Sequence, residues 1–162
     1  MNRRDAILAG ISTFAAAIAV APAAIAADET DKDFGTLVPL LKAHDDAFTK
    51  HDLPAVLATF ASKSVVMGTG PGELWSGKEE LTTAYENFFK GFDKGQQDYE
   101  YRHRVGMVTG DSAWLVTSGD SKMKKDGKEV AFPLNISFAF VKEGGAWKIS
   151  LLHFSTFTSE KG

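Results

Sequence analysis

The chain has 162 residues, a formal net charge of −3 at pH 7 and no cysteine. This length supports one domain with one hydrophobic core, and the lack of cysteine excludes disulfides, thiol catalysis and cysteine-based metal sites. Lysines and arginines are scattered along a mildly acidic chain, a pattern that argues against nucleic-acid binding.

The first 26 residues have the pattern of an export signal. Arg3 and Arg4 precede an apolar run over residues 6–20, and small residues at its end predict cleavage after Ala26. The arginine pair also resembles a twin-arginine signal, so an ordinary secretory signal and a twin-arginine signal both stay open. The run is short and alanine-rich for a membrane span, and we expect a periplasmic or secreted protein with no span in its mature form.

Two helices and a hairpin are predicted next. Apolar residues at three- and four-residue spacing predict a helix over residues 36–50. Asp52 as a cap, with Pro54 in the first turn, predicts a short second helix that ends at about Ala61. A β-branched segment over 64–70 then leads through Pro-Gly into a return segment, which predicts a β-hairpin.

A third helix and a meander complete the chain. Helical spacing of apolar residues predicts a helix over residues 77–92. Alternating segments separated by glycine-containing turns predict four strands, over residues 99–109, 113–124, 130–141 and 146–158. We therefore expect an α+β fold in which a curved antiparallel sheet packs on three helices, with a pocket wherever the space between them is unfilled.

The domain boundaries follow from these elements. The predicted order is a signal peptide over residues 1–26, a flexible segment over 27–35, the domain over 36–158 and a tail over 159–162.

The last predicted strand carries a histidine within its alternating pattern. Lys148 and Ser150 are expected to face water, so a period of two places the other set inside: Trp147, Ile149, Leu151, His153 and Ser155. A buried imidazole needs partners, since an unpaired one costs about 1–3 kcal/mol. His153 is therefore either a core histidine satisfied by a hydroxyl, backbone or water, or an acid/base or ligand-anchoring group.

A second histidine, His44, lies on the apolar stripe of the first predicted helix and is also expected to face the interior. Trp75 at the hairpin and Tyr85 on the following helix are expected to rim the opening. The predicted pocket comprises His44, Trp75, Tyr85, Trp147, His153 and Ser155, with His153 and His44 as the catalytic candidates. His51 is expected to serve the turn between two helices, and His103 to be exposed or in an oligomer contact.

The predicted outer sheet face carries apolar residues that need cover, which favours a homodimer: Ala139, Val141, Leu152 and Phe154. The sequence has no close histidine spacing of a zinc site, no nucleophile elbow and no glycine-rich phosphate loop before a helix. We expect neither a metal nor a cofactor.

Four segments, in order, resemble the SnoaL-like branch of the nuclear transport factor 2-like superfamily: LLKAHDDAFTKHDLPAVLATFASKSVVMGTG, LWSGKEEL, GDSAWLVTSG and AWKISLLHFS. The closing W-K-I and H-x-S residues are similar to the subgroup related to the calcium/calmodulin-dependent kinase II association domain. The resemblance implies a cone-like, cystatin-like αβ roll. It covers nearly all of the chain after the signal.

Ketosteroid isomerases belong to the same superfamily, and their catalytic residues can be compared by position. Their catalytic tyrosine corresponds to His44, and their general-base aspartate to Gly68. Their protonated acid falls near Asn135 or Ile136, where this chain has no acid. The resemblance therefore does not imply isomerisation of a steroid by that route.

Three functions stay open, because this fold supports many activities. The first is an exported domain that binds a small, largely apolar molecule in the cone pocket, as a homodimer. The second is an enzyme of lyase, isomerase or cyclase type, with His153 as proton carrier and His44 as polarising donor. The third is a non-catalytic protein-interaction or assembly module.

Overall fold

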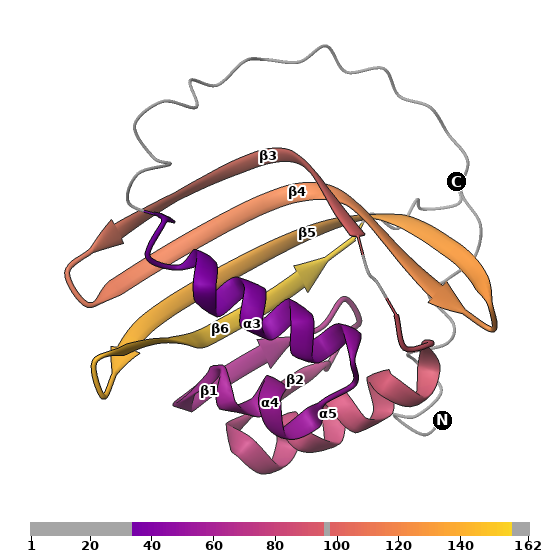
Figure 1. Ribbon diagram of the computed structural model, residues 1–162, viewed down its shortest axis with the longest axis horizontal. Helices are drawn as coiled ribbons and strands as arrows, with labels where there is room; N and C mark the ends of the chain where they lie inside the picture. Colours follow the sequence, from indigo (N-terminus) through magenta and orange to yellow (C-terminus); the bar gives the residue numbers. More distant parts are fainter. Residues whose placement is uncertain (1–33, 96–97, 157–162) are drawn as a thin grey trace.

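The computed structural model describes residues 34–95 and 98–156 (Figure 1). The predicted signal peptide over residues 1–26 and the predicted tail over 159–162 lie outside the described residues. Within them, no helix is both long enough and apolar enough to cross a bilayer.

Three helices form where the apolar spacing predicts them: α3 (Val38–Thr49), α4 (Leu53–Ala58) and α5 (Gly77–Gly91). The Asp52 carboxylate accepts a hydrogen bond from the backbone N–H of Ala55 at 3.1 Å, which caps α4 as expected. This helix ends at Ala58, three residues earlier than predicted, because the chain turns into a strand at Phe60.

The strands are β1 (Phe60–Met67), β2 (Leu74–Ser76), β3 (Asp98–Thr109), β4 (Ser112–Lys125), β5 (Lys128–Glu143) and β6 (Ala146–Ser155). They form one sheet in the order β2-β1-β6-β5-β4-β3. The meander from β3 to β6 is antiparallel as predicted, and so is the β1–β2 hairpin. The hairpin joins the meander through a parallel pairing of β1 with β6, which the expectation of an antiparallel sheet missed.

The helices lie on one side of this sheet, and β3, β4 and β5 arch over α3 (Figure 1). The core fills the space between the two layers, and its most deeply buried large residues are Leu37, Val56, Leu81, Phe140, Ile149 and Leu152. The α+β roll expected from the sequence is therefore the fold of this chain.

The core begins before the first predicted helix. Phe34 is buried, and its ring lies over Gly106 of β3, where an added Cβ would come within 2.5 Å of the ring's Cζ. The lack of a side chain at Gly106 thus provides the space that the Phe34 ring occupies. The hydrophobic core therefore includes Phe34, which precedes the predicted start of the first helix.

A β-bulge reverses the faces of β6 halfway along the strand. Phe140 of β5 pairs with Ile149 but the preceding Ala139 pairs with Leu151, so Ser150 is the extra residue. Ile149 and Leu152 consequently both face the core, whereas Leu151 is 38% exposed and Leu152 1%.

The bulge overturns the predicted orientation of His153. Period two after the bulge places His153 and Ser155 on the same face as Leu151, which is the sheet face away from the helices. Their neighbours agree, because His153 pairs with Ser137 on one side and with the exposed Met67 on the other. The uninterrupted alternation assumed from the sequence is wrong at Ser150.

Candidate functional site

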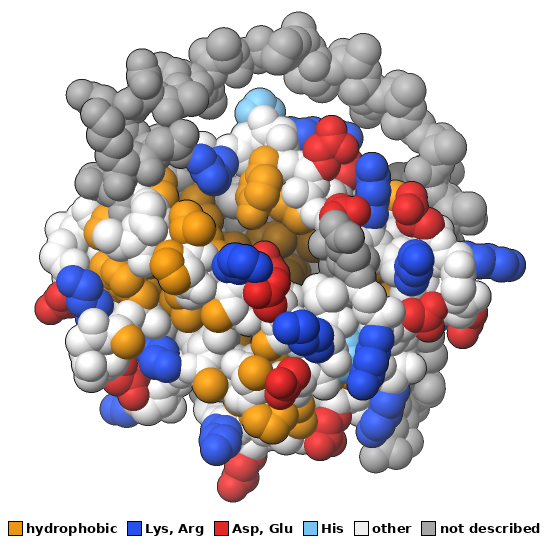
Figure 2. Space-filling view, in the orientation of Figure 1, with side chains coloured by type: hydrophobic (Ala, Val, Ile, Leu, Met, Phe, Trp, Pro, Cys, Tyr) orange, Lys and Arg blue, Asp and Glu red, His pale blue; other side chains and the backbone are white. Residues whose placement is uncertain are grey.

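A hollow with hydrophobic walls opens between the helix layer and the curved sheet. Figure 2 shows it near the centre of the face on which α3 runs beneath the arch of β3, β4 and β5. Half-buried hydrophobic residues pack against the core from both sides: Leu40 and Leu41 on α3, Ile136 and Phe138 on β5, and Phe154 on β6. All of these side chains pack against the core yet are only partly covered, and such a surface suits an apolar ligand.

His44 and Tyr85 form a buried polar pair between α3 and α5. The imidazole Nε2 lies 3.0 Å from the Tyr85 hydroxyl oxygen. Burial, together with the nearby charge of Asp45, raises the pKa of Tyr85, so the phenol keeps its proton. Nδ1 of His44 faces the Asp45 carboxylate, which can only accept, so the neutral tautomer with its proton on Nδ1 leaves Nε2 to accept from the phenol.

The other side of the imidazole faces a carboxylate. His44 Nδ1 lies 3.4 Å from Oδ1 of Asp45, whose side chain is exposed. Three rings surround the His44 imidazole: Phe48 stacks on it, while Phe60 and Tyr85 meet it edge-on, with centroids 5.9–6.2 Å away. A carboxylate, an imidazole and a phenol thus stand in sequence from the surface into the core.

Two tyrosines of β3 add further hydroxyls to the helix-facing side of the sheet. The rings of Tyr99 and Tyr101 lie 4.8 Å apart, and burial raises the pKa of both, with the charge of Asp45 contributing at Tyr101. The Tyr99 hydroxyl donates to the Leu134 carbonyl at 2.7 Å. The sequence pattern identified neither tyrosine, because a bulge in β3 between residues 101 and 103 disturbs the alternation there.

The structure brings together only part of the predicted pocket. His44 and Tyr85 are in contact, and Trp75 packs against the core on the helix side of the hairpin. Trp147 also faces the core, but it lies at the β5–β6 turn, where the Lys142 amine sits 5.1 Å from its ring centroid. This position is at the opposite end of β6 from Phe154.

His153 and Ser155 do not belong to this site. Both lie on the far face of the sheet, where the Ser155 hydroxyl accepts from the Asn135 amide at 3.4 Å. Because the sheet separates His153 from His44, the two imidazoles cannot act on one substrate atom, and the predicted acid/base pair is wrong.

The other two histidines take the positions expected of them. His51 lies between α3 and α4 with a φ of 54°, and its ring stacks on Phe89 at a centroid distance of 4.3 Å. His103 is exposed on the outer sheet face, opposite Ser118.

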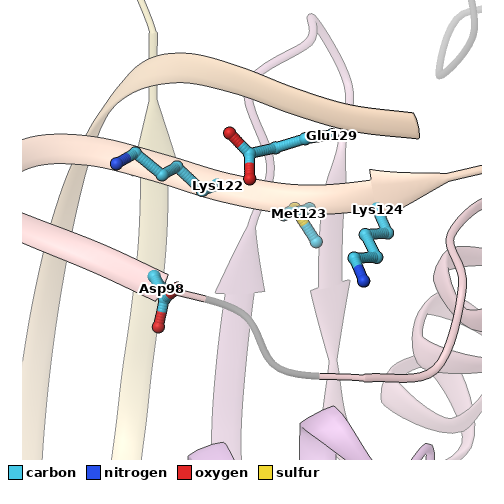
Figure 3. Close-up of a pocket in the computed structure, with 5 residues that line it drawn as sticks. All are labelled: Asp98, Lys122, Met123, Lys124 and Glu129. Carbon is cyan, nitrogen blue, oxygen red and sulfur yellow. The ribbon is translucent and has the colours of Figure 1, made fainter. Parts of the chain in front are cut away.

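A separate pocket of about 190 Å³ lies at the ends of β3, β4 and β5, lined by Asp98, Lys122, Met123, Lys124 and Glu129. Its charged side chains point in different directions and do not converge on one point (Figure 3). The pocket contains none of the predicted site residues. Within residues 34–95 and 98–156, no group of three histidine, aspartate or glutamate side chains is placed to hold a metal ion.

Comparison with known proteins agrees with the geometry. The SnoaL-like domain family matches residues 39–159. No significant match was found among the curated proteins.

Several solved structures share the fold. An NTF2-like protein of unknown function from Pseudomonas putida KT2440 has 18% identity and a TM-score of 0.66, covering 81% of this chain and 92% of its own. A ketosteroid isomerase-like protein from Erwinia carotovora atroseptica SCRI1043 has 23% identity and a TM-score of 0.63, with coverage of 79% and 98%. A Xanthomonas campestris protein named "Putative calcium/calmodulin dependent protein kinase II association domain" has 20% identity and a TM-score of 0.67, with coverage of 87% and 97%.

Proposed function

Because the chain belongs to the SnoaL-like domain family, we propose that it binds a small, largely apolar molecule in the hollow between α3 and the curved sheet. The observation that carries this proposal is the set of core-facing residues left half-buried around the hollow, Ile136, Phe138 and Phe154 among them. An apolar ligand would remove this surface from water at about 25 cal/mol per Å².

The polar groups near the hollow support a ligand that also carries a polar atom. The Asp45 carboxylate and the Tyr101 hydroxyl interact electrostatically across α3 and β3, and Tyr101 is more than half exposed. A pocket with apolar walls and a few polar groups is typical of small-molecule sites.

The test uses a neutral fluorescent probe, N-phenyl-1-naphthylamine, and two neighbouring substitutions on β5. Ile136 faces the hollow and Ser137 faces the opposite side of the sheet. Ile136→Trp should fill the hollow and weaken probe binding about tenfold or more, whereas Ser137→Trp should leave it unchanged. Equal binding by both variants would place the probe elsewhere and reject the proposal. Mass spectrometry of molecules that copurify with the protein would identify the natural ligand.

We also propose that two copies of the chain pair through the outer sheet face. Seven large hydrophobic residues are exposed there: Met67, Leu74, Val105, Met107, Trp114, Val116 and Leu151. The register places them in adjoining rows, since Met107 pairs with Trp114 and Val105 with Val116. The residues predicted from the sequence are only partly right, because Ala139 faces outward but Leu152 and Phe154 face the core. Light scattering on a sizing column should give twice the protomer mass.

The proposed site of action is the periplasm or the exterior of the cell. The arginine pair, the apolar run and the small residues before position 27 support export. Mass spectrometry of the fractionated protein should show a chain that begins at Ala27. Replacing Arg3 and Arg4 with lysine should block export if the twin-arginine route is used, and should leave it intact if the ordinary secretory route is used.

A further inference from the structure

Glu73 lies on the helix side of the β1–β2 hairpin. Val66 pairs with Trp75 and both pack into the core, whereas the next pair, Met67 and Leu74, is exposed. One residue further, the backbone N–H of Gly68 donates to the carbonyl of Glu73 at 2.8 Å. Because side chains alternate along both strands, Gly68 and Glu73 face the same side as Val66, toward the helices.

The Glu73 carboxylate fills the space that a side chain at position 68 would need. A Cβ placed on Gly68 would lie 2.3 Å from Oε2 and 2.9 Å from the Cβ of Glu73. The carboxylate is held there by the backbone N–H of Gly70, which donates to Oε2 at 2.8 Å. The glycine therefore lets a glutamate from the opposite strand lie across the inward face of β1.

The Glu73 carboxylate lies next to apolar side chains of the hollow on the neighbouring strands. Met67 pairs with His153, so Gly68 lies beside Phe154, which in turn pairs with Ile136 on β5. Glu73 is only half-buried, and among the residues that the structure describes no lysine or arginine forms an ion pair with it. An ionised carboxylate can only accept hydrogen bonds, and here it adjoins an apolar wall.

We propose that Glu73 is the hydrogen-bond acceptor of the ligand site and selects neutral apolar molecules that carry a hydroxyl group, such as phenols. This inference rests on the proposed binding function and specifies the ligand class. The hydroxyl donates to the carboxylate while the hydrocarbon part lies against Phe154 and Ile136. A ligand without a donor would gain no hydrogen bond from the carboxylate, and an anionic ligand would be repelled.

The experiment compares 2-naphthol with naphthalene, which has the same ring system without the hydroxyl. The wild-type chain should bind 2-naphthol more tightly. Glu73→Gln should weaken 2-naphthol binding about tenfold and leave naphthalene binding unchanged, because one charge-assisted hydrogen bond is lost. Glu80→Gln is the matched control, since the Glu80 carboxylate also accepts a backbone N–H, that of Ser76 at 2.8 Å, but is exposed on α5. It should bind both probes as the wild type does.

A relocation variant separates ligand recognition from a structural role in the hairpin. Glu73→Ala combined with Gly68→Asp places a carboxylate in nearly the same space from the opposite strand, and Gly68 does not have a positive φ that would strain the substitution. This double variant should recover most of the preference for 2-naphthol that Glu73→Ala alone loses.

The outcomes distinguish the two proposals. If both probes bind and Glu73→Gln leaves the 2-naphthol preference intact, the inference about Glu73 fails while the proposed binding function stands. If the double variant folds without recovering the preference, Glu73 acts on the hairpin and not on the ligand. If the wild type binds neither these probes nor N-phenyl-1-naphthylamine, the proposed function itself fails.

Discussion

His44 and Tyr85 connect α3 to α5 through a hydrogen bond of 3.0 Å inside a cage of aromatic rings. Both residues are buried, so water cannot replace either partner. The pair consequently matters more to stability than its single hydrogen bond would suggest.

A double-mutant cycle tests this pair. Tyr85→Phe removes only the hydroxyl and leaves Nε2 of His44 buried without a donor, which should lower the free energy of unfolding by about 1–3 kcal/mol. His44→Phe together with Tyr85→Phe removes both polar partners and should cost less than the sum of the single changes. Denaturant unfolding of the four proteins measures the coupling. Strict additivity would show that the contact contributes nothing.

Leu151 and Leu152 test the bulge at Ser150. Leu152 is 1% exposed and packs in the core, so Leu152→Ala should cost about 2–5 kcal/mol in the free energy of unfolding. Leu151 is 38% exposed, and Leu151→Ala should cost the isolated protomer less than about 1 kcal/mol. Denaturation at several protein concentrations separates the protomer's stability from association. Equal costs, or the reverse order, would mean that the alternation continues unbroken through Ser150.

This bulge also shows what the sequence does not specify, namely which face of the sheet each residue of β6 occupies. Helix spacing, the Asp52 cap and the glycine turns predicted every helix and strand of the domain in the right order, because each is a local signal. Two adjacent leucines fit either face equally well, and only pairing with β5 decides between them. The position of His153 was therefore wrong, although the strand that carries it was right.

Prediction of the candidate site also succeeded where the signal was local and failed where it depended on strand pairing. His44 lies on a helix whose stripe could be counted from the sequence, and its inward orientation is confirmed by its burial. Its partner Tyr85 was predicted near the opening and is buried in contact with it. Glu73 was missed because its place over Gly68 depends on hairpin register, which the Pro-Gly turn alone does not specify.

The outer sheet face predicts a dimer that one charge should disrupt. Trp114 is 40% exposed on β4. It pairs with Met107 on β3 and with Ala139 on β5, so it lies in the middle of a row of outward-facing side chains. Trp114→Glu would bury a carboxylate in an apolar contact and should shift the protein from dimer to monomer at micromolar concentration. Lys125→Glu introduces a glutamate at the end of β4, beside the β4–β5 turn and away from the apolar rows, and should leave the dimer intact. A wild-type chain that light scattering finds monomeric would refute the dimer.

The titration of His51 should lower the free energy of unfolding in acid. Burial and the nearby charge of Lys94 lower its pKa below the ordinary value of 6.5, whereas the contact with Asp93 opposes the shift only in part. The unfolded chain therefore binds a proton more readily than the folded one, and stability falls as pH drops through about 6.5 toward the lowered value. Above this range the contribution is constant. Its ring Nε2 is buried without a partner among the described residues, which agrees with a neutral imidazole.

Two asparagine variants isolate this effect. His51→Asn removes the titrating ring, and asparagine tolerates the φ of 54° better than most residues. The slope of unfolding free energy against pH between about 5 and 7 should become flatter in this variant. His103→Asn removes an exposed imidazole and should keep the wild-type slope. If the slope of His51→Asn matches that of the wild type, the acid sensitivity arises from other groups, and the stacked ring on Phe89 does not resist protonation.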